Sequence, residues 1–182
     1  MSILVVETGA IVPLANCRVT LAEFKAYVGT IPLPALTDPE YERAIVLGAR
    51  YNDGHYRARW LGFRVRPVGT IDTPAQTMEW PRLYVAVFGA APGIRPGFIY
   101  NNYLPATSIP QRLKDADCEA ALIALTTALA PILDPSVESE KLDVIETKFK
   151  ANGKKGQIEY QHIDQLLSDY LTPLGCSTVT RG

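Results

Sequence analysis

The chain has 182 residues, of which 47% are hydrophobic and 20% are charged, a composition typical of a globular protein with a sizeable core. Its 18 lysines and arginines are balanced by 19 acidic residues, so the formal net charge is −1. Because nucleic-acid binding relies heavily on cationic side chains that neutralise phosphates, this balance excludes a uniformly basic surface. Any basic surface must be local.

The cysteines Cys17, Cys118 and Cys176 are widely separated and form no C-x-x-C pattern, and only His55 and His162 could join them as ligands. This pattern predicts reduced cysteines with neither a disulfide framework nor a metal site. No stretch approaches the ~20 apolar residues that span a bilayer, and no basic segment precedes the first apolar run. We therefore expect a soluble protein made in the cytoplasm, with no membrane partner.

Residues 1–19 carry two β-rich pieces, ILVV and AIV, and predict an extended N-terminal arm or edge hairpin. The pattern changes at Thr20, because Thr20-Leu21-Ala22-Glu23 is a capping box in which a hydroxyl and a carboxylate satisfy free amides reciprocally. We expect a short helix from there to about Val28, ended by Gly29.

A proline-rich connector leads to a second predicted helix, which Asp38 can cap and in which Pro39 takes the tolerated first position. The sequence Asn52-Asp53-Gly54 is expected to end it. Helical spacing places five residues on one face that should pack on the core: Tyr41, Ala44, Ile45, Gly48 and Tyr51.

Residues 55–108 are rich in proline and glycine but keep a high density of aromatic residues, which disordered linkers lack. They predict a long, structured loop insertion. The next helix should begin at SIPQ, with Ser108 as the cap and Pro110 in the first turn, and should end at Pro131.

The last third begins with SEKLDVIETKFKA, which predicts a half-exposed strand, followed by a turn at ANGKKGQ. A short amphipathic helix should follow in HIDQLLSDYLTPL, stopped by Pro173 before an extended polar end. The predicted fold is mainly α: a small helical bundle with a long aromatic-rich loop insertion, a minor β element and extended N- and C-terminal arms. We divide it into an arm (1–19), a helical core (20–131) with the insertion at 55–108, and a segment (132–182) with a strand or hairpin, a short helix and a docking arm.

Catalysis needs titratable groups that converge, and the sequence offers few. His55 and His162 have acidic neighbours but no partner set, and we interpret both as structural or surface residues. The glycine-rich segment GAAPGIRPG matches neither a phosphate-binding loop nor a dinucleotide-binding loop. We expect no enzyme activity, no cofactor and no metal.

The segment 50–66 interleaves arginines with aromatic residues and has a single acid, Asp53. Such a mixture suits single-stranded nucleic acid, because bases stack on aromatic rings while guanidinium groups hold phosphates. Arginine and aromatic residues are also enriched at protein interfaces, and we favour that interpretation because the chain as a whole is nearly neutral. The candidate residues for either contact are Arg57, Arg59, Trp60, Arg64 and Arg66.

The segment QTMEWPRLYV draws attention because it places an amide, an indole, a proline and a guanidinium within seven positions. No base, nucleophile or ligand set elsewhere in the sequence accompanies it. We interpret Trp80 and Pro81 as a buried anchor that ties the insertion to the helices, with Arg82 pairing with an acid or a carbonyl.

The order of four pieces resembles a family of tailed-bacteriophage proteins: ETGAIVPLANCRVTLAEFKAYV, a helix ending in ARYND, QTMEWPR, and IPQRLKDADCEAALIAL. Members are labelled DnaT-like single-stranded-DNA-binding proteins, and they are similar to the head-tail connector, or head-completion adaptor, proteins of phages. The family's recurrent marks fall here on Gln76, Trp80, Pro81 and Arg82, and on Ile109, Pro110, Leu113 and Ala116. Two departures are Met78, where leucine is usual, and a longer segment between the W-P-R mark and the helix.

This resemblance implies a structural adaptor that forms a ring of twelve copies under the portal and lines the DNA channel of the virion. The implied partners are the portal protein, neighbouring copies, downstream tail or connector proteins and, non-specifically, packaged double-stranded DNA, with assembly in the host cytoplasm. A C-terminal docking arm would meet the portal through Tyr170, Leu171, Pro173, Leu174 and Arg181. The alternative is a single-stranded-DNA-binding module of phage replication or recombination.

Overall fold

The computed structural model describes residues 2–29, 33–69, 74–87, 93–95, 98–100, 103–127, 129, 139–142, 145–148 and 160–172. The predicted mainly helical fold is confirmed. The helices are α1 (Leu21–Val28), α2 (Asp38–His55), α3 (Gln111–Thr126) and α4 (Gln161–Leu167), which continues into the 3-10 helix η1 (Ser168–Tyr170). Short antiparallel pairs join β1 (Phe63–Arg64) to β2 (Arg82–Leu83), β3 (Gly93–Arg95) to β4 (Phe98–Tyr100), and β5 (Ser139–Leu142) to β6 (Ile145–Lys148).

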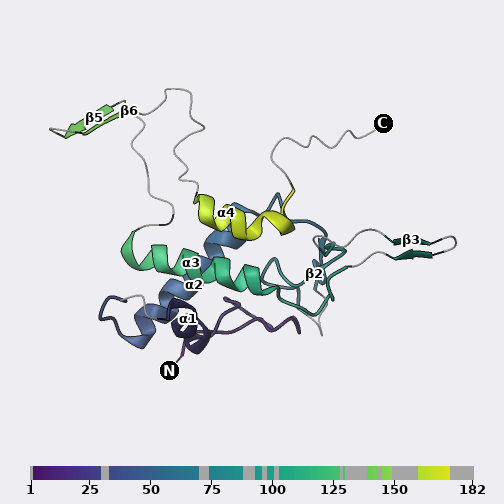
Figure 1. Ribbon diagram of the computed structural model, residues 1–182. Helices are drawn as coiled ribbons and strands as arrows, with labels where there is room; N and C mark the ends of the chain where they lie inside the picture. Colours follow the sequence, from purple (N-terminus) through teal and green to yellow (C-terminus); the bar gives the residue numbers. More distant parts are fainter. Residues whose placement is uncertain are drawn as a thin grey trace.

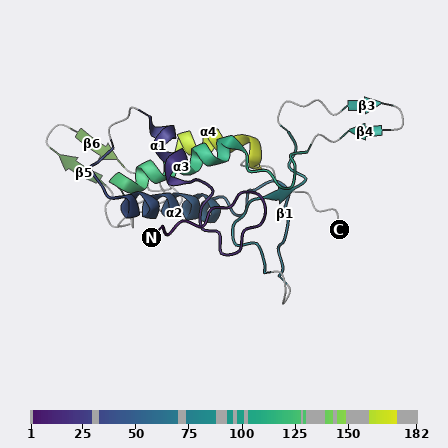
Figure 2. The same ribbon diagram turned by 90° about the horizontal axis from the view of Figure 1, so that it is seen from below.

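Helix α3 lies between α2 and α4, while α1 packs against both α2 and α3 (Figures 1 and 2). Gly48 allows the close approach of α2 and α3. A Cβ atom at this position would lie 2.7 Å from the amide nitrogen of Ala121 and 2.8 Å from the carbonyl oxygen of Asp117. The small residues that the sequence places on the facing sides of these helices therefore set the spacing of the bundle.

Among the described residues, the buried core has two parts. The first joins the N-terminal segment to α1 and α2, and its buried members include Cys17, Val19, Phe24 and Ile45. The second is aromatic and lies where the loop insertion meets α3 and α4; it includes Tyr56, Trp60, Trp80, Leu113, Ile163, Leu167 and Leu171. The insertion is thus packed onto the helices through its rings.

The predicted first helix is confirmed, including its capping box: the Thr20 hydroxyl accepts from the Glu23 amide at 3.1 Å, and the Thr20 amide donates to the Glu23 carboxylate at 2.8 Å. The second helix begins at Asp38, which was the predicted cap, and so starts one residue earlier than expected. Thr37, rather than Asp38, is the N-cap, because its amide and hydroxyl both donate to the Glu40 carboxylate at 2.7 Å.

Other helix ends also differ from the prediction, since α2 continues through Asn52-Asp53-Gly54 to His55. The Ser108 hydroxyl does not cap α3 but donates to the Pro105 carbonyl at 2.8 Å, and the N-cap is Pro110. Helix α3 ends at Thr126, before Pro131. Serine hydroxyls also form hydrogen bonds to backbone groups in turns, and here the Ser108 hydroxyl bonds to a carbonyl of the turn that precedes the helix.

The segment predicted as a strand or hairpin near residue 140 forms two antiparallel strands, in which β5 pairs with β6. The predicted turn at 151–157 and the C-terminal residues 173–182, including Pro173, Leu174 and Arg181, lie outside the described residues. At the other end, Val6 forms a bridge with Cys17, so the N-terminal segment folds back on itself against the first part of the core.

Candidate nucleic-acid interface

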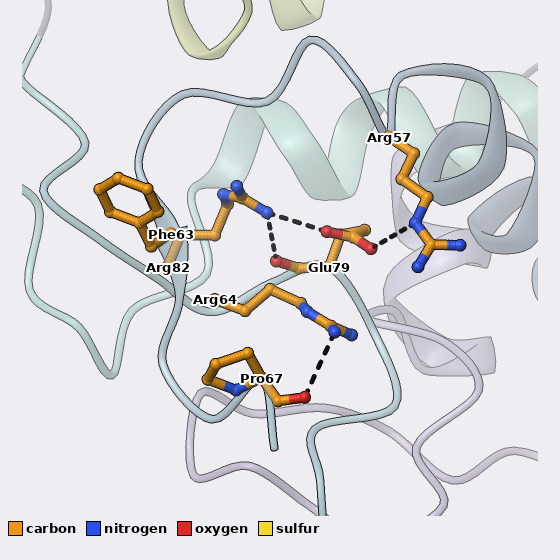
Figure 3. A pocket seen from close by; sticks show the side chains of 6 residues that line it. All are labelled: Arg57, Phe63, Arg64, Pro67, Glu79 and Arg82. Carbon is orange, nitrogen blue, oxygen red and sulfur yellow. Dashed lines mark hydrogen bonds and ion pairs between the residues drawn. The ribbon is translucent and has the colours of Figure 1, made fainter.

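An open pocket of about 270 Å³ lies where the chain leaving α2 meets the β1–β2 pair and the segment QTMEWPR (Figure 3). Of the six described residues that line it, three are arginines and one is an acid, so these six carry a formal charge of +2. The lining residues are Arg57, Phe63, Arg64, Pro67, Glu79 and Arg82.

Glu79 lies between two of the arginines, and each oxygen of its carboxylate faces one of them (Figure 3). One oxygen is 3.6 Å from Nε of Arg57, and the other accepts from Nη1 of Arg82 at 2.9 Å. The two arginines are not equivalent, because the Arg82 side chain is 8% exposed and the Arg57 side chain is 73% exposed. The carboxylate is therefore bound firmly on the Arg82 side and loosely on the Arg57 side.

Arg82 uses its guanidinium donors for hydrogen bonds to the loops around it. Its Nε donates to the Leu61 carbonyl at 2.8 Å, and its Nη2 donates to the Gly62 carbonyl at 2.7 Å. Burial lowers the pKa of the Arg82 guanidinium, while the attraction of Glu79 opposes that effect. With its donors used in this way, Arg82 supports the pocket and has little capacity left for a ligand.

Arg57 and Arg64 retain donors for a ligand. The contacts of Arg64 are long, at 3.3 Å to the Gln76 carbonyl and 3.5 Å to the Pro67 carbonyl. Phe63 stands beside them with 70% of its surface exposed, and its ring points away from Glu79 (Figure 3). The pocket thus presents two available guanidinium groups next to one exposed aromatic face.

Gln76 fixes the two loops that form the pocket. Its buried Nε2 donates to the carbonyls of Met78 at 2.9 Å and Pro81 at 2.8 Å, and its Oε1 accepts from the Arg66 amide at 3.2 Å. One amide side chain therefore satisfies three backbone groups, which explains why this position is glutamine.

A buried ion network lies behind the pocket. The Arg18 guanidinium donates to both carboxylate oxygens of Asp117, at 2.7 and 2.8 Å, and forms a further ion pair with Asp53. Asn52 donates to Asp117 at 2.9 Å, and the second oxygen of Asp53 accepts from the Glu79 amide at 3.0 Å. The network connects the N-terminal segment, α2, α3 and the pocket loop.

The charges in this network are strongly coupled. Burial alone would lower the pKa of Arg18, but the carboxylates of Asp117 and Asp53 outweigh it and raise that pKa. Removing one partner would leave a buried charge without compensation, which is strongly destabilising. The network is therefore a structural support for the position of Glu79.

The five candidate residues of the arginine-aromatic segment lie in different environments. Arg57 and Arg64 line the pocket, whereas Arg59 lies 3.7 Å from the Asp164 carboxylate and over the Tyr56 ring. Trp60 is 6% exposed and belongs to the aromatic core, and Arg66 does not line the pocket.

The proposed anchor residues lie in the interior. Trp80 is fully buried and makes edge-to-face contacts with Trp60 and Tyr170, at ring-centroid distances of 6.1 and 5.5 Å. A cis peptide bond joins it to the buried Pro81. Leu171, expected in a docking arm, is also buried and forms an antiparallel bridge with Trp60.

Sequence reasoning missed Glu79 and the Arg18–Asp117 pair. Ninety-nine positions separate Arg18 from Asp117, so no local pattern links them. Glu79 was visible as the acid beside the W-P-R mark, and its position three residues before Arg82 was the available signal.

Other site types find little support in the described part of the chain. Within it, no group of three or more His, Cys, Asp or Glu side chains could hold a metal ion, and no helix is long and apolar enough to cross a membrane. Burial raises the pKa of the Cys17 thiol to about 11, which keeps it protonated and weakly nucleophilic at neutral pH.

Comparison with known protein families gives a match over almost the whole chain. A family model described as "Putative DnaT-like ssDNA binding protein" matches residues 2–182. No curated protein and no solved structure matches the chain significantly.

The family match corrects the function predicted from the resemblance. It covers the chain from residue 2 to residue 182, and its description names single-stranded DNA as the ligand. The expected head-tail adaptor of a virion, with portal, ring and tail partners, is therefore wrong, and the match agrees with the alternative.

Proposed function

Because the chain belongs to the family of DnaT-like ssDNA-binding proteins, we propose that it binds single-stranded DNA through the pocket lined by Arg57, Phe63 and Arg64. The observation that carries this proposal is the placement of two available guanidinium groups beside an exposed ring in an open pocket. Single-strand-binding surfaces combine these features, since cations follow the backbone while bases stack on aromatic faces.

Each side chain has a separate task in this proposal. Arg57 and Arg64 donate to phosphate oxygens, for which the planar guanidinium group is well suited. Phe63 offers its exposed face to a base, and this contact requires an unpaired base, because a base within a duplex is already stacked on its neighbours. Arg82 holds the loops in place beneath them.

Glu79 limits the affinity of the pocket. A phosphate that approaches Arg57 competes with a carboxylate 3.6 Å away, so part of the attraction is already used within the protein. The net charge of the whole chain is −1, and long-range attraction of DNA is correspondingly weak. We expect salt-sensitive binding of moderate affinity without base-specific readout, and a role in binding rather than catalysis.

Fluorescence anisotropy with a labelled oligothymidylate tests this proposal. The double variant Arg57→Ala/Arg64→Ala should bind more weakly, because two phosphate contacts of up to about 1 kcal/mol each are lost, which together is up to about 30-fold. The matched control is Arg43→Ala/Arg50→Ala, which removes two exposed arginines of α2 that do not line the pocket. Equal weakening in both double variants would show that only overall charge matters and would refute the assignment of the pocket.

A further inference from the structure

A second pair of aromatic rings lies on the surface next to the pocket. Tyr84 and Tyr103 are 62% and 42% exposed, and their rings meet edge to face with centroids 5.6 Å apart. Large aromatic side chains that are this exposed and yet fixed against each other are unusual on a surface without a ligand, because burying them would be favourable. Neither residue takes part in the pocket described above.

The backbone holds both rings in fixed positions. Ala86 forms an antiparallel bridge with Tyr103, and the Leu104 amide donates to the Val85 carbonyl at 2.8 Å. Val85 is fully buried, whereas the side chain of its neighbour Tyr84 is exposed, so the two side chains face in different directions. The pair is therefore organised before any ligand arrives.

Tyr84 has a strained backbone. Its φ of 60° lies in the left-handed region, which bulky residues rarely adopt and which glycine adopts freely. Such strain persists where the surrounding structure imposes it, and it clusters at functional sites. Here the strain accompanies an outward-facing ring.

The tyrosine pair continues the surface of the pocket. Tyr84 directly follows β2, whose Arg82 lines the pocket and whose Leu83 pairs with Phe63 in the β1–β2 register. Two residue steps separate Arg82 from Tyr84, so the backbone positions of these two residues lie no more than about 7 Å apart. A cationic pocket and a second aromatic surface thus lie along one short path.

We propose that Tyr84 and Tyr103 form a second stacking subsite, which takes an unpaired base of the same DNA strand whose phosphates contact Arg57 and Arg64. This subsite rests on the proposed function, since it needs a strand anchored in the pocket. The edge-to-face arrangement leaves ring surface open, and stacking on it is independent of sequence because every base has a π-face. The neighbouring arginines favour a polyanion with bases over an apolar peptide as the occupant.

The test compares two probes of equal length, a labelled oligothymidylate and the same backbone made of abasic sites, by fluorescence anisotropy. Tyr84→Gly removes the ring while supplying the residue that prefers a φ of 60°, so the variant should remain folded. Tyr103→Ala removes the partner ring from the other segment. The matched control is Tyr27→Ala, an exposed tyrosine on α1, a helix that neither lines the pocket nor contacts the β1–β2 pair.

Each of the two variants should weaken oligothymidylate binding about 5- to 150-fold, the range that loss of one stacked base gives, and leave abasic binding unchanged. Tyr27→Ala should bind both probes like the wild type. If the wild type binds oligothymidylate and both tyrosine variants bind it equally well, the subsite is refuted while the proposed function stands. If the wild type binds neither probe, the proposed function fails, and the subsite fails with it.

Discussion

Replacing Glu79 with glutamine should tighten DNA binding while it destabilises the fold, and these opposite signs make it a discriminating change. The amide oxygen of the new side chain can still accept a hydrogen bond from Nη1 of Arg82, which now reaches the Glu79 carboxylate at 2.9 Å. A neutral amide can no longer attract Arg57, whose Nε lies 3.6 Å from the other carboxylate oxygen. The formal charge of the lining, which is +2 with Glu79 present, then becomes more positive by one unit.

The expected magnitudes follow from the exposure of each partner. The Arg57 side chain is 73% exposed, so its release is equivalent to an exposed ion pair of about 0.2 to 1 kcal/mol, or up to about fivefold in affinity. The additional free cation should make the slope of log affinity against log salt more negative by about 0.7. The Arg82 bond changes from charge-assisted to neutral, and the free energy of unfolding should fall by about 1 kcal/mol.

Anisotropy titrations at several salt concentrations and urea denaturation measure the two effects on the same protein. Glu40→Gln serves as the matched control, because it removes an equal charge at the start of α2, where glutamine still completes a capping box. Weaker binding of Glu79→Gln, or a salt slope equal to that of the wild type, would refute the idea that Glu79 competes with phosphate.

Three further predictions concern the core. Trp80→Ala should lower the free energy of unfolding in urea by about 3 to 5 kcal/mol, because the indole is fully buried; unchanged stability would contradict a structural role. Gly48→Ala should lower the free energy of unfolding, measured by calorimetry, by about 1 to 3 kcal/mol, because the new Cβ would lie 2.7 Å from the Ala121 amide nitrogen on α3. An unaltered melting temperature would show that the two helices can move apart without loss of stability. Cys17 and Cys118 are buried, and burial raises the pKa of both thiols, to about 11 for Cys17. Thiol reagents at pH 8 should therefore label these two cysteines only after unfolding, which mass spectrometry can map. Labelling of either cysteine in the folded protein would contradict its buried position.

Local signals predicted the helices well and their ends less well. The box at Thr20 and Glu23 depends only on neighbouring residues, and the prediction was confirmed. Ser108 was predicted from the same kind of pattern, but its hydroxyl satisfies the Pro105 carbonyl instead. Helix α3 begins at Gln111 with Pro110 as its N-cap, two residues after Ser108, and the local pattern alone does not fix that boundary.

The arginine-aromatic segment drew attention for a valid reason, but the sequence could not assign its members. Arg57 and Arg64 line the pocket, whereas Trp60 is in the core and Arg59 faces Asp164. Alternation or helical periodicity indicates side-chain directions only in regular structure, and this segment is largely turns between α2 and β1.

Sequence patterns could not predict contacts between residues that lie far apart in the chain. The Arg18–Asp117 pair joins residues 99 positions apart, and nothing near either residue marks it as buried. The resemblance pointed to the family that the chain matches, yet the function drawn from it was wrong. The segment QTMEWPR was interpreted as packing alone, yet its Glu79 and Arg82 line the pocket.

The most direct test of the central claim is competition at physiological salt. A labelled single strand bound to the wild-type protein is challenged with an unlabelled single strand and with a duplex of the same length. We propose that unpaired bases stack on Phe63 and on the tyrosine pair. The unlabelled single strand should therefore displace the labelled strand at a concentration at least about tenfold lower than the duplex needs. Equal displacement by the duplex, or no binding of the labelled strand at all, would contradict it.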